Sequence, residues 1–154
     1  SDHGDMQGSQ GAVNKGLPWE ESSRIPLIVR APKGVSGNVV EDVVSGVDFF
    51  PTCLDYTGCD QEDSLEGNSF ADLTRSPNAS SMDRAIYAEM KPWCMIRYGA
   101  FKLVADKEPF TLTHMFDLES DPYELNNLLG HADHVDAQRK LATKLESWWQ
   151  RVSS

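Results

Sequence analysis

The second half of the chain carries the pattern that most restricts its fold. Short runs rich in β-branched and aromatic residues lie at 85–90, 93–98, 100–105 and 111–116, with turn residues between them. Such a series of short strands separated by turns is typical of an antiparallel meander. The sequence therefore predicts a small antiparallel sheet in this half.

A helix is expected after the last strand. Between residues 133 and 152, apolar side chains recur three or four positions apart, or at multiples of these spacings; they are Val135, Leu141, Leu145, Trp148 and Trp149. This spacing places them on one side of an α-helix. We expect this amphipathic helix to cover one face of the sheet.

The first half shows a mixture of element types. Residues 25–30 form a short β-branched run next to a proline and predict a buried strand. Residues 18–22 predict one helical turn, and 47–56 predict a helix with Asp48 as its N-cap and Gly58 as its end. Residues 61–81 are polar and predict a loop, with a subdomain boundary near Asn78.

Composition limits the possible partners. The formal net charge of −10 argues against a nucleic acid partner, because phosphate binding needs a clustered basic surface. No apolar run is long enough to span a bilayer, so we expect no membrane partner either. Cys53, Cys59 and Cys94 lack the spacing of a zinc or redox motif, and we expect them to be buried or idle thiols.

The first residues suggest a polar site. Asp2 and His3 precede Gly4, which fits a strand end where the chain turns sharply. A carboxylate and an imidazole can bind a divalent cation if other ligands come from elsewhere, whereas the alternative is a solvated turn. Lys15 follows a glycine-rich loop and is suited to binding an oxyanion; otherwise it is an ordinary surface lysine.

A series of motifs resembles sulfatases of the alkaline phosphatase superfamily. In chain order they are SDHG, the loop ending in NKG, PWEESSRIPLIVRAP, VVSGVDFFPTCLDYTG, RAIYAEM, MIRYGAFKLV and FDLESDPYELNNL. The resemblance covers essentially the whole chain. It implies an α/β fold in which residues 1–78 form the C-terminal end of an alkaline-phosphatase-like core. Residues 79–154 would form a small antiparallel sheet packed by a C-terminal helix.

The resemblance also implies a function. Asp2 and His3 match two ligands of a calcium ion, and Lys15 matches the lysine that contacts the sulfate ester. The family's nucleophile is a formylglycine made within a Cys/Ser-x-Pro-x-Arg motif, which this sequence lacks. We therefore expect the C-terminal fragment of a sulfatase, inactive alone, with its nucleophile upstream and a sulfated small molecule or glycan as substrate. Its other partner would be the rest of its own polypeptide, in a periplasmic or secreted protein.

Two other functions stay open. The same arrangement of metal and lysine serves a phosphonate or phosphate ester hydrolase, and the chain could instead be a non-catalytic binding module. Many relatives have a histidine where this chain has Gln10, so the role of that position is open.

The remaining polar candidates are expected to be structural. We expect His114 to be a satisfied strand histidine, Arg97 and Lys102 to pair with acids, and Asp117 and Asp121 to cap turns. His131 and His134 are expected at the surface, and at least one of Trp148 and Trp149 in the core. Asn78-Ala79-Ser80 matches a glycosylation sequon.

Overall fold

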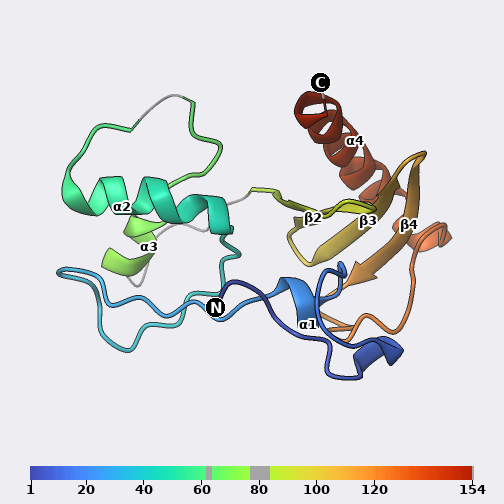
Figure 1. Ribbon diagram of the computed structural model, residues 1–154, viewed down its shortest axis with the longest axis horizontal. Coiled ribbons are helices and arrows are strands. Elements are labelled where there is room, and N and C mark those ends of the chain that lie inside the picture. Colours follow the sequence, from blue (N-terminus) through green and yellow to red (C-terminus); the bar gives the residue numbers. More distant parts are fainter. Residues whose placement is uncertain (62–63, 77–83, 154) are drawn as a thin grey trace. The chain divides into compact units, whose positions relative to one another are not determined.

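The computed structural model describes residues 1–61, 64–76 and 84–153. They form two compact units (Figure 1). One unit combines Ser1–Leu27 with Arg84–Ser154, and the other comprises Ile28–Asp83. The boundary and the sequon expected at Asn78 lie outside the described residues, so the division into 1–78 and 79–154 stays a prediction.

The antiparallel sheet predicted from the sequence is present in the first unit. Its strands β1 (Ile86–Glu89), β2 (Trp93–Tyr98), β3 (Phe101–Lys107) and β4 (Phe110–Asp117) pair in chain order, each antiparallel to the next. Gly99 has a φ of 59° in the turn between β2 and β3, a left-handed conformation that favours glycine in tight hairpins. The expected meander is therefore confirmed.

The predicted amphipathic helix covers one face of this sheet. Helix α4 (Val135–Val152) follows a 3-10 turn, η3 (Ala132–His134), and lies against the strands in Figure 1. Buried Leu141, Leu145 and Trp148 pack on a layer of strand residues: Cys94, Ile96, Leu103, Ala105 and Met115. The ring of Trp148 also stacks on Tyr87, with 4.9 Å between centroids. No helix within the described ranges has the length and apolar character needed to cross a membrane.

The N-terminal segment contacts the opposite face of the sheet. Side chains alternate along a strand, so Trp93 and Met95 point away from the layer that includes Cys94. Trp19, which precedes helix α1 (Glu20–Ser23), makes edge contacts with His114 and Phe116 on β4, at centroid distances of 5.0 and 5.5 Å. The sheet is thus buried from both sides within one unit, which the sequence pattern did not indicate.

A buried ion network holds the N-terminal segment on this face. Lys102 on β3 is fully buried, and its Nζ lies 3.1 Å from Glu20 Oε1 and 2.8 Å from Glu124 Oε1. Arg97 on β2 donates to the second oxygen of Glu20 at 3.1 Å. The backbone N–H of Glu20 in turn donates to Glu124 Oε2 at 2.6 Å. Arg97 and Lys102 therefore pair with acids, as predicted.

This network joins three parts of the chain that are far apart in sequence. They are α1, the sheet, and the loop between β4 and α4 that carries Glu124. Burial raises the pKa of Glu124 above its ordinary value, and the charge of Lys102 opposes that shift. Each charge in the network is buried only because an opposite charge is in contact with it, so losing one partner leaves the others desolvated without compensation.

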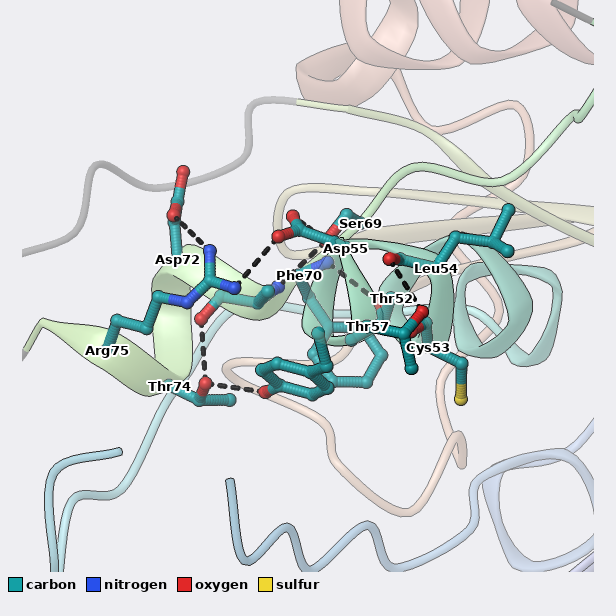
Figure 2. Close-up of polar contacts among 12 residues, drawn as sticks. Thr52, Cys53, Leu54, Asp55, Thr57, Ser69, Phe70, Asp72, Thr74 and Arg75 are labelled. Carbon is teal, nitrogen blue, oxygen red and sulfur yellow. Dashed lines mark hydrogen bonds and ion pairs between the residues drawn. The ribbon is translucent and has the colours of Figure 1, made fainter. Parts of the chain in front are cut away.

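The second unit is built on two helices. Helix α2 (Phe49–Thr57) follows the 3-10 turn η2 (Gly46–Asp48), and helix α3 (Ala71–Arg75) packs beside it. Asp55 accepts hydrogen bonds from Ser69 at 2.7 Å and from Arg75 at 2.8 Å. Dashed lines mark these two bonds in Figure 2. These bonds, first that of Ser69 and then that of Arg75, lower the pKa of Asp55. Asp55 therefore links α2 to α3, and a second contact joins the hydroxyls of Tyr56 and Thr74, 2.6 Å apart.

Two sequence expectations for residues 25–81 are wrong. Residues 25–30 form no strand, and Ile28 is 95% exposed, because no described segment pairs with this run. The expected loop at 61–81 contains α3, whose short apolar face buries Ala71 and Leu73. Asp48 occupies the N-cap position of α2, as predicted, but its side chain makes no capping hydrogen bond to that helix. Its carboxylate instead accepts the N–H of Ser45 at 2.6 Å, in a capping box that begins one turn earlier. Gly58 ends the helix as expected, with a φ of 69°.

Replacing the buried lysine tests the ion network. We expect Lys102→Met to lower the free energy of unfolding by about 3–5 kcal/mol, because it leaves buried carboxylates without their cation. Adding Glu124→Gln should restore much of that loss, since the uncompensated charge is then removed. Urea unfolding of both variants, with exposed Lys91→Met as the control, measures the difference. A cost below about 1 kcal/mol for Lys102→Met, which is typical of a surface pair, would contradict the role assigned here.

Candidate functional site

The structure brings together the three side chains that the sequence singled out near the start of the chain. Lys15 Nζ lies 2.6 Å from His3 Nε2, although the two residues are twelve positions apart. His3 Nε2 lies 3.6 Å from Asp2 Oδ2. A carboxylate, an imidazole and an ammonium therefore form one continuous polar cluster, which we call the Asp2–His3–Lys15 cluster.

The hydrogen bonds of His3 define its tautomer. Its Nδ1 lies 2.7 Å from the carbonyl oxygen of Gly4, which can only accept, so Nδ1 carries the proton. The lone pair of a neutral ring is then on Nε2, directed toward Lys15. A neutral imidazole whose other nitrogen donates to a backbone carbonyl is the form that binds metal ions.

Asp2 supplies an accessible, ionised carboxylate beside this ring. Its side chain is 88% exposed, whereas that of His3 is 37% exposed. A hydrogen bond from its own backbone amide lowers the pKa of Asp2, and the neighbouring His3 and Lys15 act in the same direction. The cluster therefore combines a carboxylate oxygen donor, whose ionised form its surroundings favour, with a nitrogen donor.

This donor set fits part of a divalent cation site. Carboxylate oxygen is a preferred ligand for calcium, and imidazole nitrogen is accepted by several divalent metals. Among the described residues, however, no group of three His, Cys, Asp or Glu side chains could hold a metal. Asp2 and His3 can supply two of the ligands. Because calcium usually takes six to eight oxygen ligands, the others would have to come from elsewhere.

Gly4 allows the cluster to lie close to α1. Its N–H donates to the carbonyl oxygen of Ser22 at 2.9 Å. A Cβ atom at this position would lie 1.9 Å from the carbonyl oxygen of Glu21, which is closer than any non-bonded contact. Only glycine fits here, and this close approach explains why it follows Asp2 and His3 in the sequence.

Gln10 anchors the glycine-rich loop between His3 and Lys15. This residue lies in the short 3-10 turn η1 (Ser9–Gly11). Its side-chain amide donates to the carbonyl oxygens of Tyr123 and Glu124, at 2.9 and 3.3 Å. Ser9 donates to Glu21. Gln10 therefore ties the loop to the same segment that carries the buried Glu124, which gives it a structural role that the sequence left open.

The predicted turn-capping acids are confirmed. Asp117 accepts the backbone N–H of Glu119 at 3.1 Å and the hydroxyl of Ser120 at 2.8 Å. Asp121 accepts the N–H of Asn126 at 2.8 Å. Both carboxylates order the loop after β4 and take no part in the Asp2–His3–Lys15 cluster.

The histidines outside the cluster differ in environment. His131 is exposed, whereas His134 is partly buried with its ring against Phe101, at a centroid distance of 5.8 Å. His114 is the strand histidine that the sequence predicted, but its buried Nδ1 makes no hydrogen bond to a described residue, so the expectation that it is satisfied is wrong for this atom. Its ring packs instead against Trp19 and Phe116.

The cysteines and the tandem tryptophans are structural. All three thiols are free; Cys94 is buried, Cys53 is partly buried and Cys59 is exposed. Burial raises the pKa of Cys94 to about 11, which makes it a poor nucleophile. Trp148 is in the core, as expected of at least one of the pair, and Trp149 packs beside it under the ammonium of Lys107, 4.5 Å from its ring centroid.

One contact to the lysine loop was missed at the sequence level. The indole N–H of Trp93, the first residue of β2, donates to the carbonyl oxygen of Gly16 at 2.9 Å. The two residues are 77 positions apart. A hydrogen bond between a side chain and a distant backbone carbonyl leaves no signal in residue spacing.

Comparison with known proteins identifies relatives of the chain. Residues 8–151 match the family described as N-sulphoglucosamine sulphohydrolase, C-terminal. The chain is 31% identical to an arylsulfatase of Clostridium perfringens over 94% of its length, and 32% identical to an N-acetylglucosamine-6-O-sulfatase of Bacteroides thetaiotaomicron over 95%. It spans 32% and 28% of those two proteins.

Solved structures share the same fold. A protein described in complex with its substrate, D-glucosamine-2-N,6-O-disulfate, is 29% identical with a TM-score of 0.84, over 97% of this chain and 33% of that one. A phosphonate monoester hydrolase of Agrobacterium radiobacter is 27% identical with a TM-score of 0.75, over 96% of this chain and 33% of that one. These structural neighbours confirm the expected fold. It is the end portion of an alkaline-phosphatase-like core, followed by a small sheet and a C-terminal helix.

The burial of His114 predicts that the folded protein becomes less stable as the pH falls. Burial lowers the pKa of His114 below its ordinary value, and Asp106 opposes this only in part. As the pH falls, the unfolded chain therefore takes up this proton before the folded chain does, and stability decreases. We expect the free energy of unfolding to fall between pH 7.5 and 5.5, and to fall less in His114→Phe.

Urea unfolding of both proteins at the two pH values measures this contribution. Phenylalanine keeps the aromatic packing against Trp19 and Phe116, so the two proteins differ mainly in the titrating group. Equal pH dependence in the two proteins would show that His114 does not carry the effect.

Proposed function

Because the chain belongs to the N-sulphoglucosamine sulphohydrolase C-terminal family, we propose that it is part of a sulfatase that hydrolyses sulfate esters. The observation that carries this proposal is the convergence of Asp2, His3 and Lys15, side chains from two ends of one loop. The family gives the reaction class, and the cluster gives a place for a tetrahedral anion. The relatives are about three times longer than this chain, so we propose that the rest of the active site lies in further segments of the same polypeptide.

Lys15 is the group we assign to the sulfate oxygens. Its ammonium is exposed and is held at the end of the glycine-rich loop by His3. A compact cation at this place stabilises negative charge that develops on the sulfuryl oxygens during ester cleavage.

We assign Asp2 and His3 to a calcium ion. The lowered pKa of Asp2 favours an ionised carboxylate that can bind a cation. The Nε2 lone pair of His3 lies against the Lys15 ammonium, so His3 would bind the ion only once Lys15 donates to the sulfate instead. A bound divalent ion at this place would supply Lewis-acid stabilisation of the sulfate ester. The nucleophile in this proposal is a formylglycine outside these 154 residues, so the chain alone would be inactive.

The substrate we propose is a sulfated small molecule or glycan. Two relatives point to a sulfated glucosamine as substrate. One is the N-acetylglucosamine-6-O-sulfatase, and the other is the protein solved in complex with D-glucosamine-2-N,6-O-disulfate. A sulfated amino sugar is therefore the first substrate class to test. The localisation we propose for the whole protein is periplasmic or secreted.

A phosphonate ester hydrolase is the second candidate. The solved phosphonate monoester hydrolase from Agrobacterium radiobacter is a specific reason to retain it, at 27% identity. A cation and a lysine that bind a tetrahedral sulfate also bind a tetrahedral phosphonate. Relative rates on matched sulfate and phosphonate esters distinguish the two reactions.

Removing the lysine tests the proposed reaction. In the protein that carries this chain, we expect Lys15→Ala to lower kcat/KM for a sulfate ester by about 100- to 1,000-fold, as loss of one oxyanion donor does in other enzymes. Steady-state hydrolysis of 4-nitrophenyl sulfate and of a sulfated glucosamine measures the change. Exposed Lys91→Ala is the control. Unchanged activity in Lys15→Ala would reject the assignment and favour the non-catalytic binding module.

Calcium binding provides a test that does not depend on turnover. We expect Asp2→Asn to weaken calcium binding by at least 10-fold, because it removes a charged oxygen ligand. Isothermal titration with calcium chloride measures the dissociation constant, and Asp5→Asn, three residues along the chain, is the matched control. Equal affinity in all three proteins would place the ion elsewhere.

A further inference from the structure

We propose that Trp93 is a positioning residue for Lys15, so that the antiparallel sheet fixes where the ammonium of the site lies. This inference rests on the proposed function, because it assigns a role in the same reaction. It adds a residue outside the Asp2–His3–Lys15 cluster, on a different element and far away in sequence. Trp93 acts through the backbone of the lysine loop and does not contact the reacting groups.

The backbone on both sides of Lys15 is held by hydrogen bonds. The carbonyl oxygen of Asn14, before it, accepts the N–H of Met6 at 2.7 Å. After it, the N–H of Gly16 donates to Ser22 Oγ at 2.9 Å, and the Gly16 carbonyl accepts the indole N–H of Trp93 at 2.9 Å. The chain on either side of the lysine is thus fixed from three separate places, and Trp93 is the one on the sheet.

The conformation of Gly16 gives this last bond a particular role. Its φ is 90°, in the left-handed region that favours glycine. Glycine has more backbone freedom than any other residue, so the peptide that follows Gly16 needs outside restraint. Its N–H donates to Ser22 Oγ at 3.4 Å, and the bond from Trp93 to its carbonyl, at 2.9 Å, is the shorter of the two. The Trp93 bond therefore restrains the most flexible link next to the lysine.

Trp93 is itself rigidly held. Its side chain is 7% exposed and packs with Met95 and Val104 on the sheet face that meets the N-terminal segment. It pairs with Asp106 in the β2–β3 ladder, and its carbonyl accepts the N–H of Met90 at 2.9 Å. A donor fixed to a sheet in this way can hold a loop in one position, which a mobile surface side chain cannot do.

The experiment removes the indole N–H and compares two tryptophans of similar burial. In the protein that carries this chain, we expect Trp93→Phe to lower kcat for a sulfate ester by about 10- to 100-fold with little change in KM, because small displacements of a catalytic group have effects of this size. Trp148→Phe is the matched control, since Trp148 is 9% exposed and packs under α4 on the other face. The control should stay within about twofold of wild type.

A double-mutant cycle separates a positioning role from general destabilisation. If Trp93 acts through the lysine, Trp93→Phe has no further effect on kcat once Lys15→Ala is present. Additive losses in the double variant, or equal losses in Trp93→Phe and Trp148→Phe, would overturn the inference. Rates are normalised to the folded fraction measured by circular dichroism.

A second variant covers the case in which Trp93→Phe does not fold. A tryptophan analogue with sulfur in place of the indole N–H, installed at position 93, keeps the shape of the ring and removes only the donor. It should show the same kcat loss as Trp93→Phe, and wild-type turnover would overturn the inference. If Lys15→Ala alone leaves activity unchanged, the proposed function fails; if Lys15→Ala abolishes activity while the analogue is fully active, only the role of Trp93 fails.

Discussion

The buried ammonium of Lys102 is the interaction on which the first unit depends. It is fully buried between the carboxylates of Glu20 and Glu124, and Arg97 completes the charge balance on Glu20. Desolvating these groups is costly, and only a geometry that brings all of them together compensates for it. That requirement selects a single way for the N-terminal segment, the sheet and the loop after β4 to pack, because any other packing leaves a buried charge unpaired.

The candidate site depends on this arrangement. Gly4 bonds to the backbone of α1, Gln10 to the carbonyl of Glu124, and Gly16 to Trp93 on the sheet. Each anchor of the loop that carries His3 and Lys15 thus belongs to an element that the ion network holds in place. In this chain, the small antiparallel sheet therefore contributes to the geometry of the polar cluster in addition to the stability of the fold.

Local patterns predicted the elements that are stabilised by neighbours in sequence. The meander and α4 were found because each strand pairs with the next one along the chain, and because the apolar face of α4 repeats at helical spacing. The run at 25–30 has an equally good strand pattern, but a strand also needs a partner, and no described segment pairs with it. Helix α3 was missed because five residues are too few to show a period.

The sequence by itself determined the sheet, the amphipathic helix and the residue types of the cluster, since these follow from periodicity and from motifs within the first sixteen residues. Only the tertiary structure decided which groups hold the cluster in place. Glu20 and Lys102 are 82 positions apart, and Gly16 and Trp93 are 77 apart. Ion pairs and hydrogen bonds depend on distance in space and on direction, and neither quantity is contained in the spacing of residues along a chain.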